Sequence, residues 1–103
     1  MNFYEAEVHL NNCNFINPRS EDGLNIIRSK FTLNNCLFEN TESDAFDGDF
    51  VEGIIKNSKF INLGNDAIDV SGSDLKISRV VISNANDKGL SAGQLNEGIK
   101  IAD

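Results

Sequence analysis

The chain has 103 residues, of which 40% are hydrophobic, with eight glycines and one proline, a composition typical of a single folded domain rather than a disordered chain. Sixteen acidic and nine basic residues give a net charge of −7. This charge argues against a nucleic-acid-binding surface and favours cations as small partners. No apolar run approaches the roughly 20 residues that span a bilayer. The first seven residues lack the basic and apolar regions of an export signal.

An eight-residue phrase recurs along the chain, beginning at Val8, Phe31, Gly53 and Leu75. The intervals are 31 − 8 = 23, 53 − 31 = 22 and 75 − 53 = 22 residues, and a fifth copy is expected at 97–99. A repeat this short cannot bury its apolar face without a stacked neighbour, so the spacing predicts a solenoid. The predicted unit spans 1–103, with repeats at about 8–30, 31–52, 53–74 and 75–96 and a partial repeat at 97–103.

The phrase alternates apolar and polar residues, breaks at a corner and then resumes, which predicts two short strands. A shorter segment later in each repeat predicts a third strand. The chain is therefore expected to be all-β, with three short strands per turn, about 22 residues per turn and four to five turns. Like residues should then stack on like residues. The predicted inward columns are Leu10, Leu33, Ile55, Ile77 and Ile99; Cys13, Cys36, Ser58 and Val80; Phe15, Phe38, Phe60 and Ile82; Leu24, Phe46, Ile68 and Leu90; and Ile26, Gly48, Val70 and Ala92.

Two further columns consist of asparagine and predict an Asn ladder at the corners. They are Asn12, Asn35 and Asn57 between the first two strands, and Asn17, Asn40, Asn62 and Asn84 at the end of the second strand. Asparagine tolerates left-handed backbone angles, and stacked amides can hydrogen-bond along the stack. Arg79 interrupts the first of these columns, so we expect that corner to change shape.

Cys13 and Cys36 occupy equivalent places in two successive repeats. Stacked strands bring their Cα atoms to about 4.8 Å, which a disulfide tolerates, but the parallel side chains leave the Cβ atoms wider apart than the preferred ~3.8 Å. Two buried, apolar thiols are the favoured interpretation, with a disulfide as the alternative. The cysteines therefore leave the redox compartment open.

In its repeats the sequence resembles the right-handed parallel β-helix family, the scaffold of pectate-lyase-like and polygalacturonase-like proteins. The resemblance rests on the phrase Asn-Cys-Leu-Phe38 and its equivalents, each followed after a turn by Asp-Ala-(apolar), as at Asp44, or by Asp-Gly-(apolar), as at Asp22. It implies a right-handed, single-stranded parallel β-helix, cut from a longer protein that is extracellular or at the cell surface. Lyases, hydrolases, epimerases, adhesins and structural segments share this scaffold, so it does not by itself assign an activity.

An acidic face is predicted on the third strand, where the pattern Asp-Ala-(apolar)-Asp occurs at 44–47 and again at 66–69. The outward residues of this strand are Asn25, Asp47, Asp69 and Ser91, and the residues that open it are Asp22, Asp44, Asp66 and Lys88. Adjacent carboxylates repel one another, so the stack needs compensation. The opening aspartates could form Asx-turns with the backbone that follows, the stack could bind Ca²⁺ weakly, or neighbouring carboxylates could share protons. The ammonium of Lys88 is expected to neutralise the end of the stack.

Asp44, Asp47, Asp66 and Asp69 are both the candidate Ca²⁺ ligands and the candidate catalytic residues. They look like the paired acidic motifs of polygalacturonase-like hydrolases. The rest of that pattern is missing, because the chain has no Gly-His-Gly or Arg-x-Lys phrase and its one histidine, His9, lies on a different strand. A lyase would need a basic residue at this face, for which the sequence offers only Arg28, Lys30 and Lys88.

The function predicted from these observations is a non-catalytic β-helix segment of a carbohydrate-interacting protein. The alternative is part of a polysaccharide lyase or glycoside hydrolase that uses the stacked aspartates. The expected partners are a polysaccharide and the neighbouring β-helix turns of the parent chain, without nucleic acid or a membrane span.

Overall fold

The computed structural model describes residues 1–18, 22–92 and 98–102, and all the regular structure in these ranges is β-strand. No helix that could cross a membrane is found among them. The strands are β1 (Asn2–Tyr4), β2 (Glu7–Asn11), β3 (Asn14–Ile16), β4 (Leu24–Ile27), β5 (Lys30–Asn34), β6 (Leu37–Thr41), β7 (Phe46–Asp49), β8 (Glu52–Leu63), β9 (Ile68–Ser71), β10 (Asp74–Ala85), β11 (Leu90–Ala92) and β12 (Gly98–Ala102).

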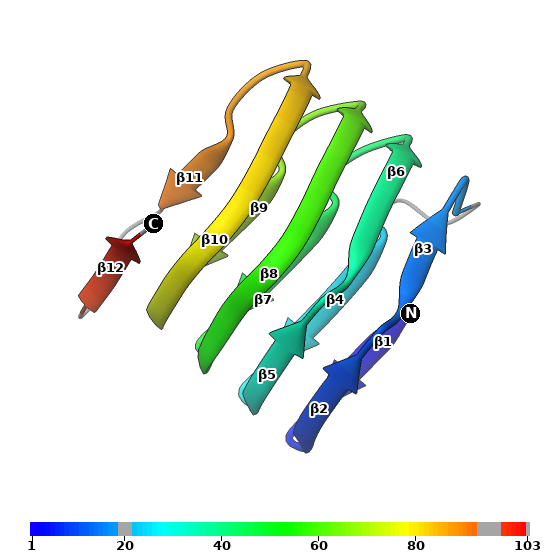
Figure 1. Ribbon diagram of the computed structural model, residues 1–103. Coiled ribbons are helices and arrows are strands. Elements are labelled where there is room, and N and C mark those ends of the chain that lie inside the picture. Colours follow the sequence, from blue (N-terminus) through cyan, green and yellow to red (C-terminus); the bar gives the residue numbers. More distant parts are fainter. Residues whose placement is uncertain (19–21, 93–97, 103) are drawn as a thin grey trace.

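The strands stack in parallel as a β-solenoid of about four turns, as the repeat predicts. One sheet has the order β1-β4-β7-β9-β11, and the other has the order β12-β10-β8-β5-β2, with β3 and β6 continuing beside β8. Successive turns lie side by side in Figure 1, and the two ends of the chain lie toward opposite ends of the stack. Every strand therefore meets the equivalent strand of the neighbouring turn.

The first two turns contain three strands each, whereas β8 and β10 run through the first corner as single strands of 12 residues. The corner persists within these long strands, because Asn57 and Arg79 have left-handed φ values of 53° and 52°. The expectation that Arg79 changes the corner is therefore wrong. Strand pairing on both flanks of this corner, between Ser78 and Lys56 and between Val80 and Ser58, holds its shape and outweighs the cost of a left-handed angle, about 1–2 kcal/mol for most residues.

The register pairs three of the predicted columns along their whole length, those that begin at Phe15, Leu24 and Ile26, although Ile82 at the end of the first is exposed, and it corrects the end of the Leu10 column. Leu33 pairs with Leu10 and Ile55, and Ile55 pairs with Ile77, but the partner of Ile77 in β12 is Ile101 and not Ile99. The interval there is 101 − 77 = 24 residues, two more than in the preceding turn, so the fifth copy is shifted. Glu97, at the predicted start of that copy, lies outside the described residues. Strand β1 was not predicted and adds one more third strand beside β4.

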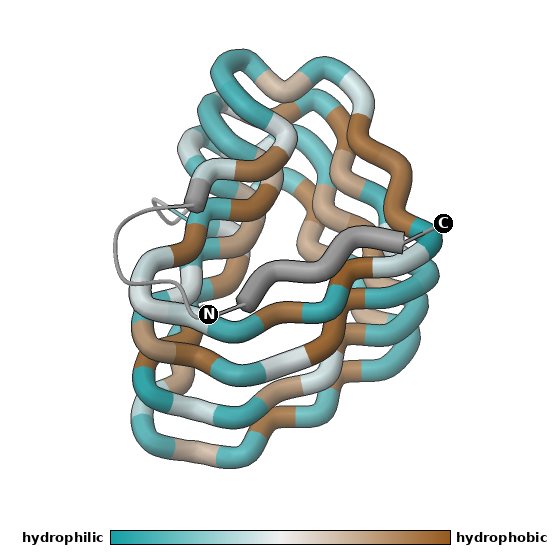
Figure 2. The backbone as a smooth tube through the Cα atoms, turned by 90° about the vertical axis from the view of Figure 1, so that its left-hand side faces the viewer, coloured by the Kyte–Doolittle hydropathy of each residue, from teal (hydrophilic) through white to brown (hydrophobic). Residues whose placement is uncertain are grey.

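The core is a set of continuous columns of apolar side chains between the two sheets. Phe38 stacks on Phe15 and on Phe60 with centroid distances of 4.7 Å and interplanar angles of 7° and 3°. Gly53 leaves room for the ring of Phe31 in the turn before it, where a Cβ would overlap that ring. Hydrophobic and hydrophilic positions recur one above another in successive turns (Figure 2). The most deeply buried large side chains are Phe38, Phe46, Phe60, Leu24, Ile26, Leu33, Ile55, Ile68 and Leu75.

All seven predicted corner asparagines have left-handed backbone angles, with φ between 51° and 59°. Asn35 Nδ2 donates a hydrogen bond to Asn12 Oδ1 (2.6 Å), and Asn84 Nδ2 donates to Asn62 Oδ1 (2.9 Å). Asn57 instead donates to Oδ1 of Asn34 (3.0 Å), the residue before its predicted partner. Stacking of asparagine amides by hydrogen bonds is therefore confirmed at these steps, with a change of partner at Asn57.

Both cysteines are free thiols, and Cys36 is buried while Cys13 is half-buried. Burial raises the pKa of the Cys36 thiol. Ser58 follows Cys36 in the same column, where its hydroxyl accepts a hydrogen bond from the Cys36 N–H (3.1 Å) and donates to the carbonyl of Lys56 (2.9 Å). The small residues of this column thus satisfy backbone groups at the corner as well as filling the core.

Replacing Phe60 by alanine should lower the free energy of unfolding by about 3 to 5 kcal/mol, because a fully buried ring leaves a cavity beneath Phe38. Phe50→Ala is the matched control, since 54% of that side chain is exposed. Urea denaturation of the two variants checks the prediction. Similar losses of stability in both variants would contradict the register of the phenylalanine column.

Candidate functional site

The aspartates that open the third strand hold the next turn in place. Asp44 Oδ1 accepts hydrogen bonds from the Asp66 N–H (3.0 Å) and from Asn65 Nδ2 (2.9 Å). One turn further, Asp66 Oδ1 accepts from the Lys88 N–H (3.0 Å). Asp44 and Asp66 are both buried. The predicted Asx-turn is therefore wrong in its partner, because these carboxylates cap the backbone of the following turn and not of their own.

Because the side chains of Asp44 and Asp66 extend to the next turn, their direction determines which carboxylates lie close together. Asp44 points toward the turn that carries Asp69, whereas Asp66 points toward the turn where the equivalent residue is Ser91. One carboxylate oxygen from each of Asp44, Asp47 and Asp69 lies within 4.8 Å of the others. We call these three residues the acid row. Asp66 was also a predicted site residue, but it lies outside this group.

Two carboxyls of the acid row, those of Asp47 and Asp69, have pKa values above the ordinary value of an aspartate. Burial, followed by the negative charges of Asp49, Asp22, Asp69 and Asp44, raises the pKa of Asp47 to about 7. Burial is also the main cause that raises the pKa of Asp69 to about 6, followed by a side-chain hydrogen bond with Asp44 and by the charge of Asp44. Proton sharing between neighbouring carboxyls, one of the three predicted forms of compensation, stays a prediction, and the hydrogen bond between Asp69 and Asp44 favours it at this pair.

The Lys88 ammonium makes its direct contact with Asp87, outside the acid row, and the charges of Asp66 and Asp69 also raise its pKa. Its Nζ atom lies 3.2 Å from Asp87 Oδ2, and this hydrogen bond is the main cause that raises the pKa of Lys88. The side chain is exposed, and the contact with Asp66 comes from the backbone N–H. The predicted compensation by Lys88 is therefore supported in part, since Asp66 and Asp69 attract its ammonium and its main chain donates a hydrogen bond to Asp66.

A hard cation at the acid row would have oxygen ligands from Asp44, Asp47 and Asp69, the chemistry that Ca²⁺ prefers. Asn25, the strand partner of Asp47, has a buried Oδ1 atom without a hydrogen-bond partner among the described residues. Asp66 is a poor ligand, because its carboxylate caps the next turn. A weak Ca²⁺ site here stays a prediction, with three of the four predicted carboxylates.

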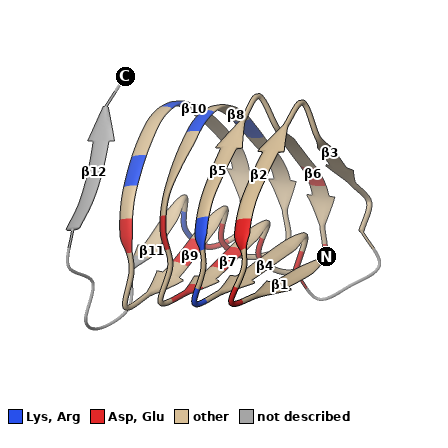
Figure 3. Cartoon of the chain, turned by 90° about the horizontal axis from the view of Figure 1, so that it is seen from below, with Lys and Arg blue, Asp and Glu red and all other residues tan. Residues whose placement is uncertain are grey.

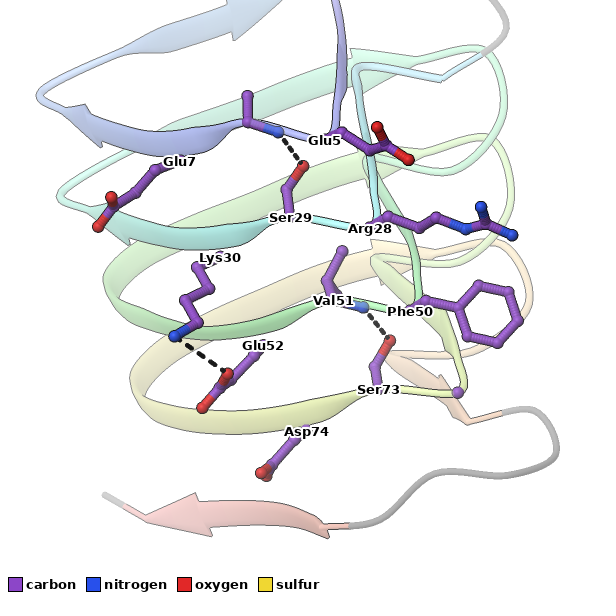
Figure 4. Close-up of a pocket in the computed structure, with 12 residues that line it drawn as sticks. Glu5, Glu7, Arg28, Ser29, Lys30, Phe50, Val51, Glu52, Ser73 and Asp74 are labelled. Atoms are coloured by element: carbon purple, nitrogen blue, oxygen red, sulfur yellow. Dashed lines mark hydrogen bonds and ion pairs between the residues drawn. The ribbon is translucent and has the colours of Figure 1, made fainter.

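A second site, which the sequence did not reveal, lies at the corner between the third strand and the first strand of the next turn. It is an open groove with a volume of about 690 Å³, shown in Figure 4, and we call it the corner trough. It is lined by Glu5, Ala6, Glu7, Arg28, Ser29, Lys30, Phe50, Val51, Glu52, Gly72, Ser73 and Asp74. These are four sets of three consecutive residues from four successive turns, so the trough runs along the stack.

One wall of the trough consists of residues with left-handed backbone angles: Glu5 (φ 48°), Arg28 (49°), Phe50 (55°) and Gly72 (63°). The Phe50 ring lies against Gly72, where an added Cβ would come within 2.7 Å of two ring atoms. Arg28 lies on the ring, with its guanidinium carbon 5.9 Å from the centroid, within the range of a cation–π contact. The side chains of Glu5, Arg28 and Phe50 all point outward on this wall (Figure 4).

The floor of the trough is held by serine hydroxyls. Ser29 Oγ accepts from the Ala6 N–H (3.0 Å) and donates to the Ile27 carbonyl (2.8 Å). Ser73 Oγ accepts from the Val51 N–H (3.1 Å) and donates to the Ser71 carbonyl (2.9 Å). Each serine thus bridges two turns where the corner interrupts the backbone ladder, which fixes the shape of the floor.

The other wall carries charged side chains at the start of four neighbouring strands: Glu7, Lys30, Glu52 and Asp74. Figure 3 shows these charges where β2, β5, β8 and β10 begin. Lys30 Nζ lies 4.0 Å from Glu52 Oε2, and both side chains are exposed, so this pair is weak. Arg28 and Lys30, named above as candidate bases for a lyase, are therefore part of the trough.

Two further grooves follow the asparagine corners. One, of about 710 Å³, includes Asn40, Asn62 and Asn84, and the other, of about 400 Å³, includes Asn12, Asn35 and Asn57. Several of their amides are engaged in bonds that hold the turns together. The corner trough differs because its lining includes an exposed aromatic ring and both acidic and basic side chains.

Comparison of the chain with models of protein families, with curated proteins and with solved structures found no match. The acid row and the corner trough are therefore the two candidate functional sites of the described residues.

The acid row should make the protein more stable in mild acid than at alkaline pH. The native state binds protons at Asp47 and Asp69 more tightly than an aspartate with the ordinary pKa of 3.8, so the free energy of unfolding should fall as the pH rises from about 4 to about 7. Asp47→Asn should reduce this fall, and Glu42→Gln, which removes an exposed carboxylate elsewhere, should not. Thermal melts of the three proteins across this range check the prediction. Parallel pH profiles for all three would contradict it.

Millimolar Ca²⁺ should raise the melting temperature modestly, because an open row of carboxylates holds the ion weakly. The Asp47→Asn, Asp69→Asn double variant should lose this response. The measurement is a thermal melt with and without Ca²⁺, with Mg²⁺ as a comparison. If the melting temperature of the unaltered protein ignores Ca²⁺, the cation site is wrong and proton sharing alone relieves the row.

Proposed function

We propose that this chain is a non-catalytic β-helix segment that binds a linear polysaccharide lengthwise in the corner trough. The observation that carries the proposal is the trough itself, an open groove along the stack with an exposed aromatic ring between charged and hydroxyl groups. Carbohydrate sites need such a mixture, because a sugar ring has an apolar C–H face and polar edges. Phe50 would supply the stacking surface, and its neighbours would supply hydrogen bonds.

The spacing of the turns favours a glycan over a peptide as the occupant. Equivalent residues of neighbouring turns are separated by the distance between parallel strands, about 4.8 Å. One pyranose unit of an extended glycan advances by a similar length, so each turn can contact one sugar. An extended peptide advances about 3.3 Å per residue, and its side-chain repeat of two residues does not match the turns.

The proposal includes the setting that the pectate-lyase-like resemblance suggests, a longer protein that acts outside the cell or at its surface. In such a protein this segment would present part of a continuous binding surface. Asp44 and Asp66 support the non-catalytic form of the proposal, because both are buried and committed to hydrogen bonds between turns. Removing either charge would disturb the stack before it disturbed any chemistry.

A lyase or hydrolase that uses the acid row is the second candidate. It is favoured by the raised pKa values of Asp47 and Asp69, since perturbed carboxyls close together are typical of acid–base catalysts. Their closest oxygens lie within 4.8 Å, nearer to the roughly 5 Å of retaining glycosidases than to the ~6.5–9.5 Å of inverting ones. The candidate catalytic groups would then be Asp47 and Asp69, with Asp44 positioning Asp69.

Calorimetric titration with soluble linear oligosaccharides of neutral, uronic-acid and amino-sugar types tests the proposed function. We expect one of these classes to bind, and Phe50→Ala to weaken its binding by about tenfold or more, which corresponds to about 1.4 kcal/mol. Val81→Ala is the matched control, because Val81 is equally exposed (54%) and lies outside the trough. Binding that survives Phe50→Ala unchanged would overturn the trough as the site. New reducing ends or unsaturated products that disappear in the Asp47→Asn, Asp69→Asn variant would establish the enzyme instead.

A further inference from the structure

The charge of the corner trough indicates which class of glycan it binds. Its carboxylates are Glu5, Glu7, Glu52 and Asp74, and its cations are Arg28 and Lys30, so the lining has a net charge of 2 − 4 = −2. The whole chain, this lining included, carries a net charge of −7. A polyuronate would be repelled at this surface, whereas a cationic ligand would be attracted.

We propose that the ligand of the corner trough is a glycan with protonated amino groups, of the glucosamine type, and that one ammonium sits between Glu52 and Asp74. This inference rests on the proposed function, because it names the class of sugar for the same trough. Glu52 and Asp74 are register partners on neighbouring strands, so their carboxylates start from backbone positions about 4.8 Å apart. Two like charges in this arrangement leave a place for a cation between them.

No lysine or arginine of the described residues forms an ion pair with both Glu52 and Asp74. Lys30 approaches Glu52 from the preceding turn, at the 4.0 Å limit of an ion pair, and so lies on the side away from Asp74. Asp74 has no ion pair among the described residues, and it is exposed. At the other end of the wall, Glu7 has two neighbours that can carry positive charge, His9 at 3.3 Å and Lys30 in the next strand. The Glu52–Asp74 end is therefore where an additional cation is most favoured.

Phe50 adds a second contact for the same ligand. It is two residues from Glu52 on the same turn, and its ring extends over Gly72, the equivalent residue of the turn that carries Asp74. The position of Arg28 on this ring shows that it accepts a cation at this corner. An amino sugar would bring its ammonium to the carboxylates and its apolar face to the ring.

The test compares three ligands of matched length in calorimetry at mildly acidic pH, where the amines are charged: a glucosamine hexamer, an N-acetylglucosamine hexamer and hexalysine. We expect the glucosamine hexamer to bind at least about tenfold more tightly than the other two, and added salt to weaken its binding because the contact is exposed. The Glu52→Gln, Asp74→Asn variant should lose this preference. The Glu39→Gln, Glu42→Gln variant removes the same charge outside the trough and should keep it.

The outcomes separate this inference from the function on which it rests. If both hexasaccharides bind equally, or only the acetylated one binds, the amino-sugar inference is overturned and glycan binding stands. If hexalysine binds as tightly as the glucosamine hexamer, the trough selects charge without regard to sugar, which overturns the glycan as its ligand. If no hexasaccharide or other glycan binds, the proposed function fails and the inference fails with it. Glu39 is half-buried and the other three side chains are exposed, so a melting curve for each variant checks that the protein remains folded.

Discussion

The whole structure depends on the parallel pairing of each turn with the next at a fixed register. Backbone hydrogen bonds join equivalent strands along both sheets, so every side chain lies beside its equivalents one turn away. For apolar residues this constraint is favourable, and it produces the column in which Phe38 stacks between Phe15 and Phe60. For charged residues it is costly, because like charges are held about 4.8 Å apart. Both candidate sites lie where carboxylates of neighbouring turns are held close together in this way.

At the corners the backbone changes direction and the hydrogen bonding between strands is interrupted. Some backbone N–H groups there need a side-chain oxygen as acceptor. Ser29, Ser58 and Ser73 each accept an N–H from the preceding turn, while Asp44 and Asp66 accept one from the following turn. A buried N–H without such a partner would cost about 1 to 3 kcal/mol. The small polar residues of the repeat are thus structural, and a functional role for Asp44 or Asp66 has to be compatible with this duty.

The columns and the asparagine corners could be predicted from the sequence because they repeat by residue type at a constant interval. Strand β1 could not be predicted, because three residues give no periodic signal. The pairing of Ile77 with Ile101 could not be predicted either, because this turn is two residues longer than the turn before it. The trough was missed for a different reason. Glu5, Arg28, Phe50 and Gly72 share one backbone conformation but no chemistry, and of these only Gly72 is a residue type that signals a left-handed corner. At such a position the stack determines the conformation and leaves the side chain free to vary.

The sequence predicted where the acidic face lies but not which of its carboxylates come together, because side-chain directions are not determined by the repeat. The spacing of Asp47 and Asp69 placed them side by side, but only the direction of the Asp44 side chain decides that it joins them and that Asp66 does not. The acid row can reduce its own repulsion by holding protons, because burial disfavours the charged carboxylates of Asp47 and Asp69. Glu52 and Asp74 are exposed and lie in an open trough, where a mobile cation can reach them. Repulsion between stacked carboxylates is therefore relieved differently in the two places. The acid row relieves it by holding protons, whereas Glu52 and Asp74 relieve it by binding a cation. This difference favours the trough as the binding surface.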